Sequence, residues 1–324
     1  MIKKTFSKLK NVLPISVGFL FIYYSYINTT LDEREYIINS IIKADYKYVF
    51  ISLFFGLLSH LSRAYRWRYM LSPIGYNIKF QNSFMSIMAG YITNLGIPRS
   101  GELIRATILY TYEKVDFNKG LGTIITERII DVIVLLICIL IGISFYPNLW
   151  FENYVFDLKK IMLYFILIIS VILLVYLVIK KMNITHKIIS FLSGLKKGIM
   201  SLFIMPKKEK FLLHTFFIWL MYFLMIYIVK FSLPETHSLD FKPIFIAFVS
   251  GVIAFSTTNG GIGIYPLVIA SVLNQYNVNY ESALAFGWIV WTTQTVLFIF
   301  IGSLSFVLLP IINKNKLFNA KNSN

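Results

Sequence analysis

The chain has 324 residues, of which 57% are hydrophobic and 14% are charged, and its mean hydropathy is +0.70. A soluble domain carries about 25% charged residues, so this composition excludes a soluble globular enzyme and indicates a polytopic membrane protein. The formal net charge is +16. The Lys and Arg residues are concentrated in alternate loops between the apolar segments, a distribution that indicates membrane topology and not nucleic-acid binding.

Apolar segments of the length needed to cross a bilayer, about 20 residues, recur along the whole chain. The six segments cover approximately residues 12–28, 48–65, 121–145, 161–179, 211–231 and 283–309. A basic stretch precedes the first segment and no small-residue cleavage site follows it, so we expect an uncleaved anchor.

Loops that hold acidic residues alternate with loops rich in Lys and Arg. The acidic loops are 29–45, 146–157 and 232–240, and the basic segments are 66–79, 180–210 and 314–324. The positive-inside rule then predicts that both termini are cytoplasmic. This assignment is consistent only if residues 82–113 and 243–275 each enter and leave the membrane on one face. Both segments are therefore predicted to be re-entrant hairpins, the first opening inward and the second outward.

The predicted fold is all-α, with six full spans and two re-entrant hairpins in an inverted repeat. Residues 1–313 form a single transmembrane domain in this prediction, and 314–324 form a basic cytoplasmic tail. The two halves are expected at about 48–145 and 211–309. Between them, residues 182–205 have apolar residues at helical spacing, which predicts an amphipathic helix on the inner leaflet, either a connector or a lipid sensor.

A glycine-rich break occurs at a matching position in both halves. Residues 94–105 read Asn-Leu-Gly-Ile-Pro-Arg-Ser-Gly-Glu-Leu-Ile-Arg. An offset of 165 residues relates Asn94 to Asn259, and without a gap it also relates Gly122 to Gly287. Broken hydrophobic segments at corresponding positions of two halves are typical of transporters built from inverted repeats.

Charged residues at membrane depth occur only in the first of these halves. They are Arg99, Glu102 and Arg105 in the hairpin and Glu127, Arg128 and Asp131 in the following span. Each would cost about 2.5–3.5 kcal/mol if it were unpaired at the bilayer centre, so these residues must pair or face water. Two interpretations stay open: a closed salt-bridge network that holds the hairpin, or a polar cavity whose charges exchange partners when a substrate enters.

The breaks themselves predict a binding function. Irregular backbone at membrane depth is tolerated where it is buried in protein or lines water, and a half-helix N-terminus offers N–H groups to a phosphate. The candidate substrate-binding residues are Asn94, Arg99, Glu102, Arg105, Glu127, Arg128, Asp131, Asn259, Gly260, Gly261 and Gly263. We expect Arg99, Arg105 and the hairpin N-termini to hold a phosphate.

Other polar residues carry less information. Arg63, Arg66, Trp67 and Arg68 at the end of the second span are expected to be interfacial anchors. The histidines lack the spacing of paired metal ligands, and no nucleotide-binding or catalytic motif is present, so neither a metal nor a cofactor is expected.

The residues 94–105, Glu127-Arg128 with Asp131, and Gly260-Gly-Ile-Gly together resemble the lysylphosphatidylglycerol synthase transmembrane-region family over nearly the whole chain. The resemblance implies a flippase-like membrane region. In the larger relatives a separate cytosolic domain attaches lysine to phosphatidylglycerol, and this chain has no room for that domain. Family members often carry a glutamate after the second hairpin, where this chain reads Ile264-Tyr265-Pro266, which leaves that hairpin uncharged.

Together these observations predict a multi-pass protein of the bacterial cytoplasmic membrane that moves a phospholipid or a polyprenyl-phosphate-linked lipid. Its expected partners are membrane lipids and either further copies of the chain or a separate lipid-modifying enzyme. Two alternatives stay open: a membrane-embedded lipid-phosphate transferase with Glu127 or Asp131 as its base, and an accessory subunit without transport activity.

Overall fold

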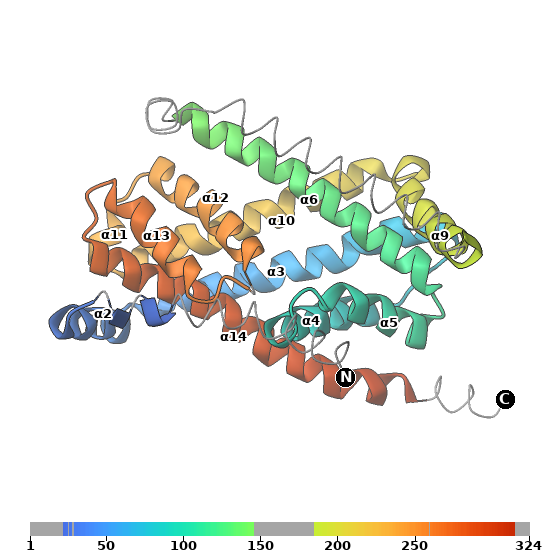
Figure 1. Ribbon diagram of the computed structural model, residues 1–324, viewed down its shortest axis with the longest axis horizontal. Coiled ribbons are helices and arrows are strands. Elements are labelled where there is room, and N and C mark those ends of the chain that lie inside the picture. The colour runs from blue at the N-terminus through green and yellow to red at the C-terminus, as the bar shows by residue number, and fades with distance from the viewer. Residues whose placement is uncertain (1–21, 25, 28, 146–184, 259, 315–324) are drawn as a thin grey trace.

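A computed structural model describes residues 22–24, 26–27, 29–145, 185–258 and 260–314 of the protein. The predicted spans at 12–28 and 161–179 lie wholly or largely outside these residues, as does the tail from 315 onward. The described part of the chain is helical and contains no strand, in agreement with the predicted all-α class (Figure 1).

The described part of the chain forms the following helices. They are α2 (Leu31–Lys43), α3 (Tyr46–Leu71), η1 (Ser72–Ile74), α4 (Phe80–Gly96), α5 (Gly101–Glu113), α6 (Phe117–Phe145), α9 (Thr185–Ile204), α10 (Lys208–Val229), η2 (Lys230–Ser232), α11 (Pro234–His237), α12 (Phe241–Thr257), α13 (Ile264–Asn274) and α14 (Tyr280–Ile312). Side-chain caps mark several starts: Asp45 accepts a hydrogen bond from Lys47 N at 3.0 Å before α3, and Asn279 accepts one from Glu281 N at 3.0 Å before α14.

Three of the described helices are long and apolar enough to cross a membrane. These segments are Phe117–Phe145, Lys208–Ser232 and Tyr280–Ile312, with a mean hydropathy of 2.6, 2.1 and 2.5 in their most apolar windows. The chain is therefore a multi-pass membrane protein. The predicted number of six spans and the orientation of the termini remain predictions.

The two predicted hairpins are pairs of helices joined by tight turns. The first pair is α4 and α5, and the second pair is α12 and α13. Figure 1 shows the pairs toward opposite ends of the bundle, with the long helix α14 running past both. The tips of the pairs meet: a Cβ atom placed on Gly260 would lie 3.1 Å from Leu95 Cδ2.

The order of helices repeats along the chain. Helices α3, α4, α5 and α6 begin at residues 46, 80, 101 and 117, and α10, α12, α13 and α14 begin 161–163 residues later, at 208, 241, 264 and 280. These differences are close to the offset of 165 residues that relates Asn94 to Asn259. The agreement supports an internal repeat, whereas the inverted symmetry of the halves in space remains a prediction.

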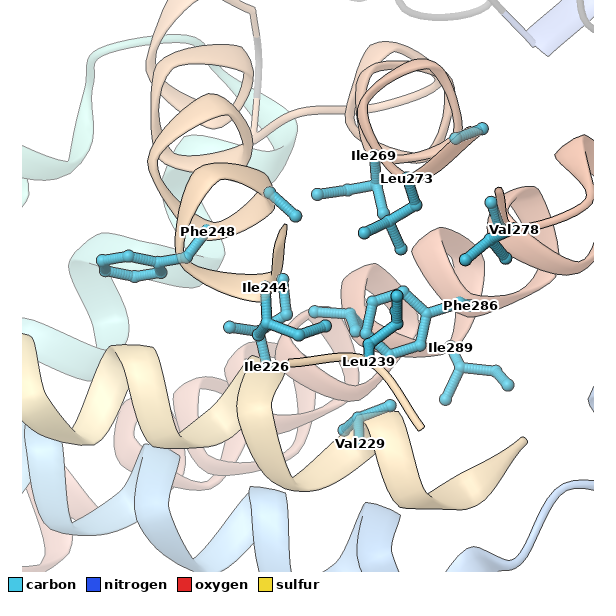
Figure 2. Packing of buried hydrophobic residues seen from close by; sticks show 14 of the residues in the cluster. Ile226, Val229, Leu239, Ile244, Phe248, Ile269, Leu273, Val278, Phe286 and Ile289 are labelled. Atoms are coloured by element: carbon cyan, nitrogen blue, oxygen red, sulfur yellow. The ribbon is translucent and has the colours of Figure 1, made fainter. Parts of the chain in front are cut away.

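The larger hydrophobic core lies among α10, α12, α13 and α14. Figure 2 shows Ile226 of α10 beside Ile244 of α12, with Ile269 of α13 and Phe286 of α14 completing the cluster. Each of these four side chains is at most 2% exposed. This core holds the second helix pair against the C-terminal helix.

A second core joins the N-terminal half to α10 and includes Trp67 of α3. The sequence interpretation of Trp67 as an interfacial anchor is wrong. Its side chain is fully buried, and its Nε1 donates a hydrogen bond to Thr123 Oγ1 of α6 at 2.9 Å. The indole N–H of Trp67 thus has its hydrogen-bond partner inside the protein, and the side chain stabilises helix packing instead of lying at a membrane surface.

Helix α9, predicted as an amphipathic interfacial helix, packs closely on α6. A Cβ atom on Gly122 of α6 would lie 2.6 Å from the carbonyl oxygen of Leu195, and one on Gly198 of α9 would lie 2.7 Å from the backbone of Gly122. Because Gly122 and Gly198 carry no side chains, the backbones of α6 and α9 can approach this closely. The end of α9 still exposes Met200, Phe203 and Ile204.

Candidate functional site: a buried ionic cluster beside a central cavity

Three helices bring charged residues together inside the bundle. Arg63 and Arg66 lie one turn apart on α3, Arg105 lies on α5, and Glu127 and Asp131 lie one turn apart on α6. The i,i+3 and i,i+4 spacings place each pair on one face of its helix, so that the acidic face of α6 meets the basic face of α3.

Glu127 is the centre of this cluster. Its side chain is 0% exposed. It forms an ion pair with Arg63, another with Arg66 Nη2 at 3.2 Å, and a third with Arg105 Nη2 at 2.9 Å. A fully buried carboxylate is tolerated when its charge is compensated and its oxygen atoms are hydrogen-bonded. Three guanidinium groups compensate the charge of Glu127, and Arg63 and Arg105 donate hydrogen bonds to its oxygen atoms.

Asp131 extends the cluster by one helical turn. Its two carboxylate oxygens lie 3.0 Å from Arg63 Nη1 and 2.9 Å from Arg66 Nη1. Arg66 also donates to Thr215 Oγ1 of α10 at 3.1 Å, and Arg63 donates to the Tyr222 hydroxyl of α10 at 3.3 Å. The cluster therefore connects α3 and α6 to α10.

The sequence interpretation of Arg63 and Arg66 as interfacial anchors is also wrong. Their side chains are 3% and 0% exposed, and both are ion-paired inside the protein. Sequence reasoning missed these two residues because an arginine near the end of a span can either extend to the interface or turn inward. Glu127 and Asp131 share a face of α6, and that helix does not carry enough cations within reach to pair with both. This excess of acids was the available signal that arginines of another helix turn inward.

Arg105 is placed differently from the expectation that it holds a phosphate. Its guanidinium is buried, pairs with Glu127, and lies 4.3 Å above the ring of Trp67. This environment satisfies the charge of Arg105 within the protein. Arg105 thus pairs inside the ionic cluster, and its expected role in holding a phosphate stays a prediction.

Arg128 has the longest ion-pair distances of the clustered arginines. Its Nε lies 3.4 Å from Glu102 Oε1, and its Nη1 lies 3.9 Å from Asp131 Oδ2. Both distances are long for charge-assisted hydrogen bonds, and Nε has no hydrogen-bond partner among the described residues. The Arg128 side chain is 40% exposed and that of Glu102 is 28% exposed.

The cluster carries a net positive charge. Its described members are the arginines 63, 66, 105 and 128 and the acids 102, 127 and 131. Four positive charges against three negative charges leave one positive charge in excess. Glu127 and Asp131 supply two negative charges against the three positive charges of the other arginines, so the excess lies in the buried part of the cluster. Arg128 and Glu102 balance one to one but are only loosely paired.

Arg128 lines a cavity of about 280 Å³ in the middle of the bundle. Arg63, Arg128 and Asp131 form its polar end. The remaining wall is mainly aromatic and comes from both helix pairs and from α10 and α14, including Tyr91, Trp219, Tyr222, Phe248, Phe255, Tyr265 and Phe298. A mostly apolar cavity with a few convergent polar groups is typical of a ligand site.

The turn between α4 and α5 contains the other hairpin candidates. Asn94 Oδ1 accepts a hydrogen bond from Gly101 N at 2.7 Å, so Asn94 closes the turn and uses a donor that was expected to be free. Arg99 has a positive φ of 57° and is exposed. Helix α5 begins at Gly101, so Arg99 lies before the helix that carries Glu102 and Arg105.

The turn between α12 and α13 consists largely of glycine. Gly260, Gly261 and Gly263 have φ values of 67°, 75° and 74°, a region that residues with a Cβ seldom adopt. The Gly260 carbonyl accepts a hydrogen bond from Trp291 Nε1 of α14 at 2.8 Å. Asn259 lies outside the described residues. The glycines therefore shape the tip, and residues 260–266 include no charged residue.

His60 lies behind the aromatic wall. It is fully buried, and neither ring nitrogen has a hydrogen-bond partner among the described residues. Its ring centroid is 4.9 Å from that of Tyr91 and 5.4 Å from that of Phe298. In the part of the chain that the structure describes, no group of His, Cys, Asp and Glu could hold a metal ion.

Comparison with known proteins gives one family and one curated relative of note. The family model described as "Lysylphosphatidylglycerol synthase TM region" matches residues 11–302. A UPF0104 membrane protein of Methanocaldococcus jannaschii is 25% identical over 169 residues, which are 48% of this chain and 49% of the relative. The chain thus spans about half the length of that relative. No solved structure matches the chain.

Proposed function

The chain belongs to the lysylphosphatidylglycerol synthase transmembrane-region family, and we propose that it moves a lipid with a phosphate-containing headgroup across a membrane. The family is a membrane region with a lipid-related role. The observation that carries the proposal is the position of Arg128, a weakly paired arginine at the polar end of the central cavity.

The charge of the cluster selects the headgroup. A single excess positive charge at membrane depth is costly unless an anion compensates it. A phosphodiester carries one negative charge and offers two oxygen atoms to a guanidinium. It therefore fits the polar end of the cavity, where two arginines face one acid and Arg128 is only loosely paired with Glu102 and Asp131.

The size of the cavity limits what enters. About 280 Å³ lies just below the usual range for ligand pockets, roughly 300–1,000 Å³, and is too small for a whole phospholipid. In this proposal the headgroup occupies the cavity, and the acyl chains remain along the apolar outer surface of α6, where Val132, Leu136 and Leu140 are exposed.

The helix tips provide a route between the two ends of the bundle. The tip at Leu95 and the tip at Gly260 meet, and Trp291 fastens the second tip to α14. Alternate separation of each tip from its neighbours would open the cavity first to one side and then to the other, as in transporters built from repeats. We place this activity in the bacterial cytoplasmic membrane, with the chain acting as a homo-oligomer or beside a separate lipid-modifying enzyme.

The test is the Arg128→Gln variant in a proteoliposome assay with fluorescent phosphatidylglycerol. We expect a loss of at least tenfold in the rate of movement between leaflets, with an unchanged melting temperature, because Arg128 contributes little to the closed ionic cluster. The matched control is Lys210→Gln, an exposed cation at the start of α10 that does not line the cavity. Lipid movement at the wild-type rate in Arg128→Gln would contradict the proposed site.

A further inference from the structure

A second cavity lies at the basic end of the bundle, apart from the central one. Its volume is about 390 Å³. It is bounded by the end of α3, the short helix η1, and the junction of α9 with α10, and its lining includes Tyr65, Arg68, Tyr69, Tyr76, Asn77 and Lys207. None of its lining residues is shared with the central cavity.

The charged residues of this cavity are both cations. Arg68 and Lys207 line it, and no acidic residue does. Neither cation forms an ion pair with any other residue that the structure describes. The Arg68 guanidinium lies 5.8 Å above the ring of Tyr65, which holds it at the rim. Two uncompensated cations at one cavity favour an anionic ligand.

Hydroxyl donors add to the two cations. The Tyr76 oxygen accepts hydrogen bonds from Lys119 Nζ at 3.3 Å and from Asp116 N at 3.4 Å, so its own proton is free to be donated. Tyr65 and Tyr69 also line the cavity, and their rings contact His214. Phosphate oxygens accept hydrogen bonds from such donors, and a guanidinium binds them in a bidentate manner.

Apolar groups adjoin this polar lining. Ile78 and Met205 are buried at the base of the cavity. Phe203 and Ile204, which directly precede Met205, are 62% and 57% exposed. A polar cavity next to exposed apolar side chains at the end of an amphipathic helix fits a lipid whose headgroup enters the cavity and whose chains contact the helix.

We propose that this cavity is a second anion site, which binds the phosphate group of an anionic phospholipid independently of the central cavity. The site fastens α9 and the start of α10 to a lipid headgroup at the membrane surface. It does not depend on lipid movement through the central cavity, and it would persist if the protein moved no lipid.

The experiment measures the melting temperature of the detergent-purified protein with increasing dihexanoylphosphatidylglycerol, dihexanoylphosphatidylcholine or inorganic phosphate. We expect saturable stabilisation by the anionic lipid, and an affinity at least tenfold lower in the double variant Arg68→Gln/Lys207→Gln. The matched control is Lys208→Gln/Lys210→Gln, which removes two neighbouring exposed cations that do not line the cavity. It should keep wild-type affinity.

The variants also separate this site from the central one. Arg128→Gln should keep the part of the stabilisation that Arg68→Gln/Lys207→Gln removes, because Arg128 does not line this cavity. Equal stabilisation by inorganic phosphate would identify the free anion as a ligand of the same site. Equal loss in both double variants, loss in Arg128→Gln alone, or no stabilisation by either phosphate-containing anion would overturn the proposal.

Discussion

At the scale of single residues, burial decides which charges have which role. Glu127 is enclosed by Arg63, Arg66 and Arg105, whereas Arg128 keeps two distant partners and a partly exposed side chain. Neighbours in sequence therefore differ in function. Glu127 stabilises the ionic cluster, and Arg128 is the group that remains available to a ligand in the proposed function.

Glu127→Gln should strongly destabilise the protein. Removal of one partner from a buried ion pair costs about 3–5 kcal/mol, and Glu127 compensates three arginines. We expect a large fall in the melting temperature of the purified protein. The control is Glu102→Gln, whose carboxylate is 28% exposed and should contribute no more than about 1 kcal/mol. Similar melting temperatures for both variants would refute the central position of Glu127.

At the scale of helices, glycine determines how closely two elements approach. Gly122 lies where α6 meets α9, and the backbone of Leu195 occupies the space that a Cβ would need. Gly142, on the same helix, has no atom of the described residues within 4 Å of its Cβ position. Gly122 and Gly142, two of the three glycines of α6, thus give a matched comparison between a position packed against backbone and one without a close neighbour among the described residues.

Gly122→Ala should weaken the packing of α9, because backbone atoms cannot move aside as the end of a flexible side chain can. Overpacking of this kind costs about 1–3 kcal/mol. Thermal unfolding of the variant should show a lower midpoint than the wild type, and Gly142→Ala should not. A midpoint in Gly122→Ala equal to that of Gly142→Ala would show that α9 is not held by this contact.

The tip of the second helix pair depends on one side-chain hydrogen bond. Trp291→Phe removes the donor to the Gly260 carbonyl but keeps an aromatic ring. A lost hydrogen bond of this type costs about 1 kcal/mol. We expect faster amide hydrogen exchange at residues 260–264 in Trp291→Phe. The control Trp288→Phe alters the tryptophan that packs against Trp291, with ring centroids 5.7 Å apart. Unchanged exchange at the tip would contradict the fastening role of Trp291.

At the scale of the whole molecule, the same series of helices occurs twice. The starts of α3 to α6 recur in α10 to α14 after 161–163 residues, and the tips of the two helix pairs meet between the halves. The central cavity is lined from both halves. A site between two repeats changes accessibility when one half moves against the other.

Opposite orientation of the halves is testable by cysteine labelling. Ser72 follows α3 and Ser238 follows α11, and both are exposed. In a Cys138→Ala background, we expect a membrane-impermeant maleimide to label Ser238→Cys in intact cells and Ser72→Cys only after permeabilisation. Labelling of both positions from one side would contradict the inverted topology and the cytoplasmic placement of the basic loops.

Much of the architecture follows from the sequence alone. Apolar length and composition determined a multi-pass helical membrane protein, because segments of low charge are stable as helices in a bilayer. The glycine-rich breaks determined that residues 82–113 and 243–275 form helix pairs with turns near Asn94 and Gly260. The cost of isolated charge required Glu127 and Asp131 to have partners, without stating which ones.

Only the tertiary structure decided how the charges are paired. The rotation of α3 about its axis turns Arg63 and Arg66 inward, and that rotation depends on the packing of Trp67 against α6. Helix α5 begins after Arg99, which separates that residue from Glu102 and Arg105. Sequence spacing defines the face of a helix on which a residue lies, but contacts with other helices decide where that face points. For this reason the sequence determined that a charged site exists, and the packing decided that Arg128 lines its cavity.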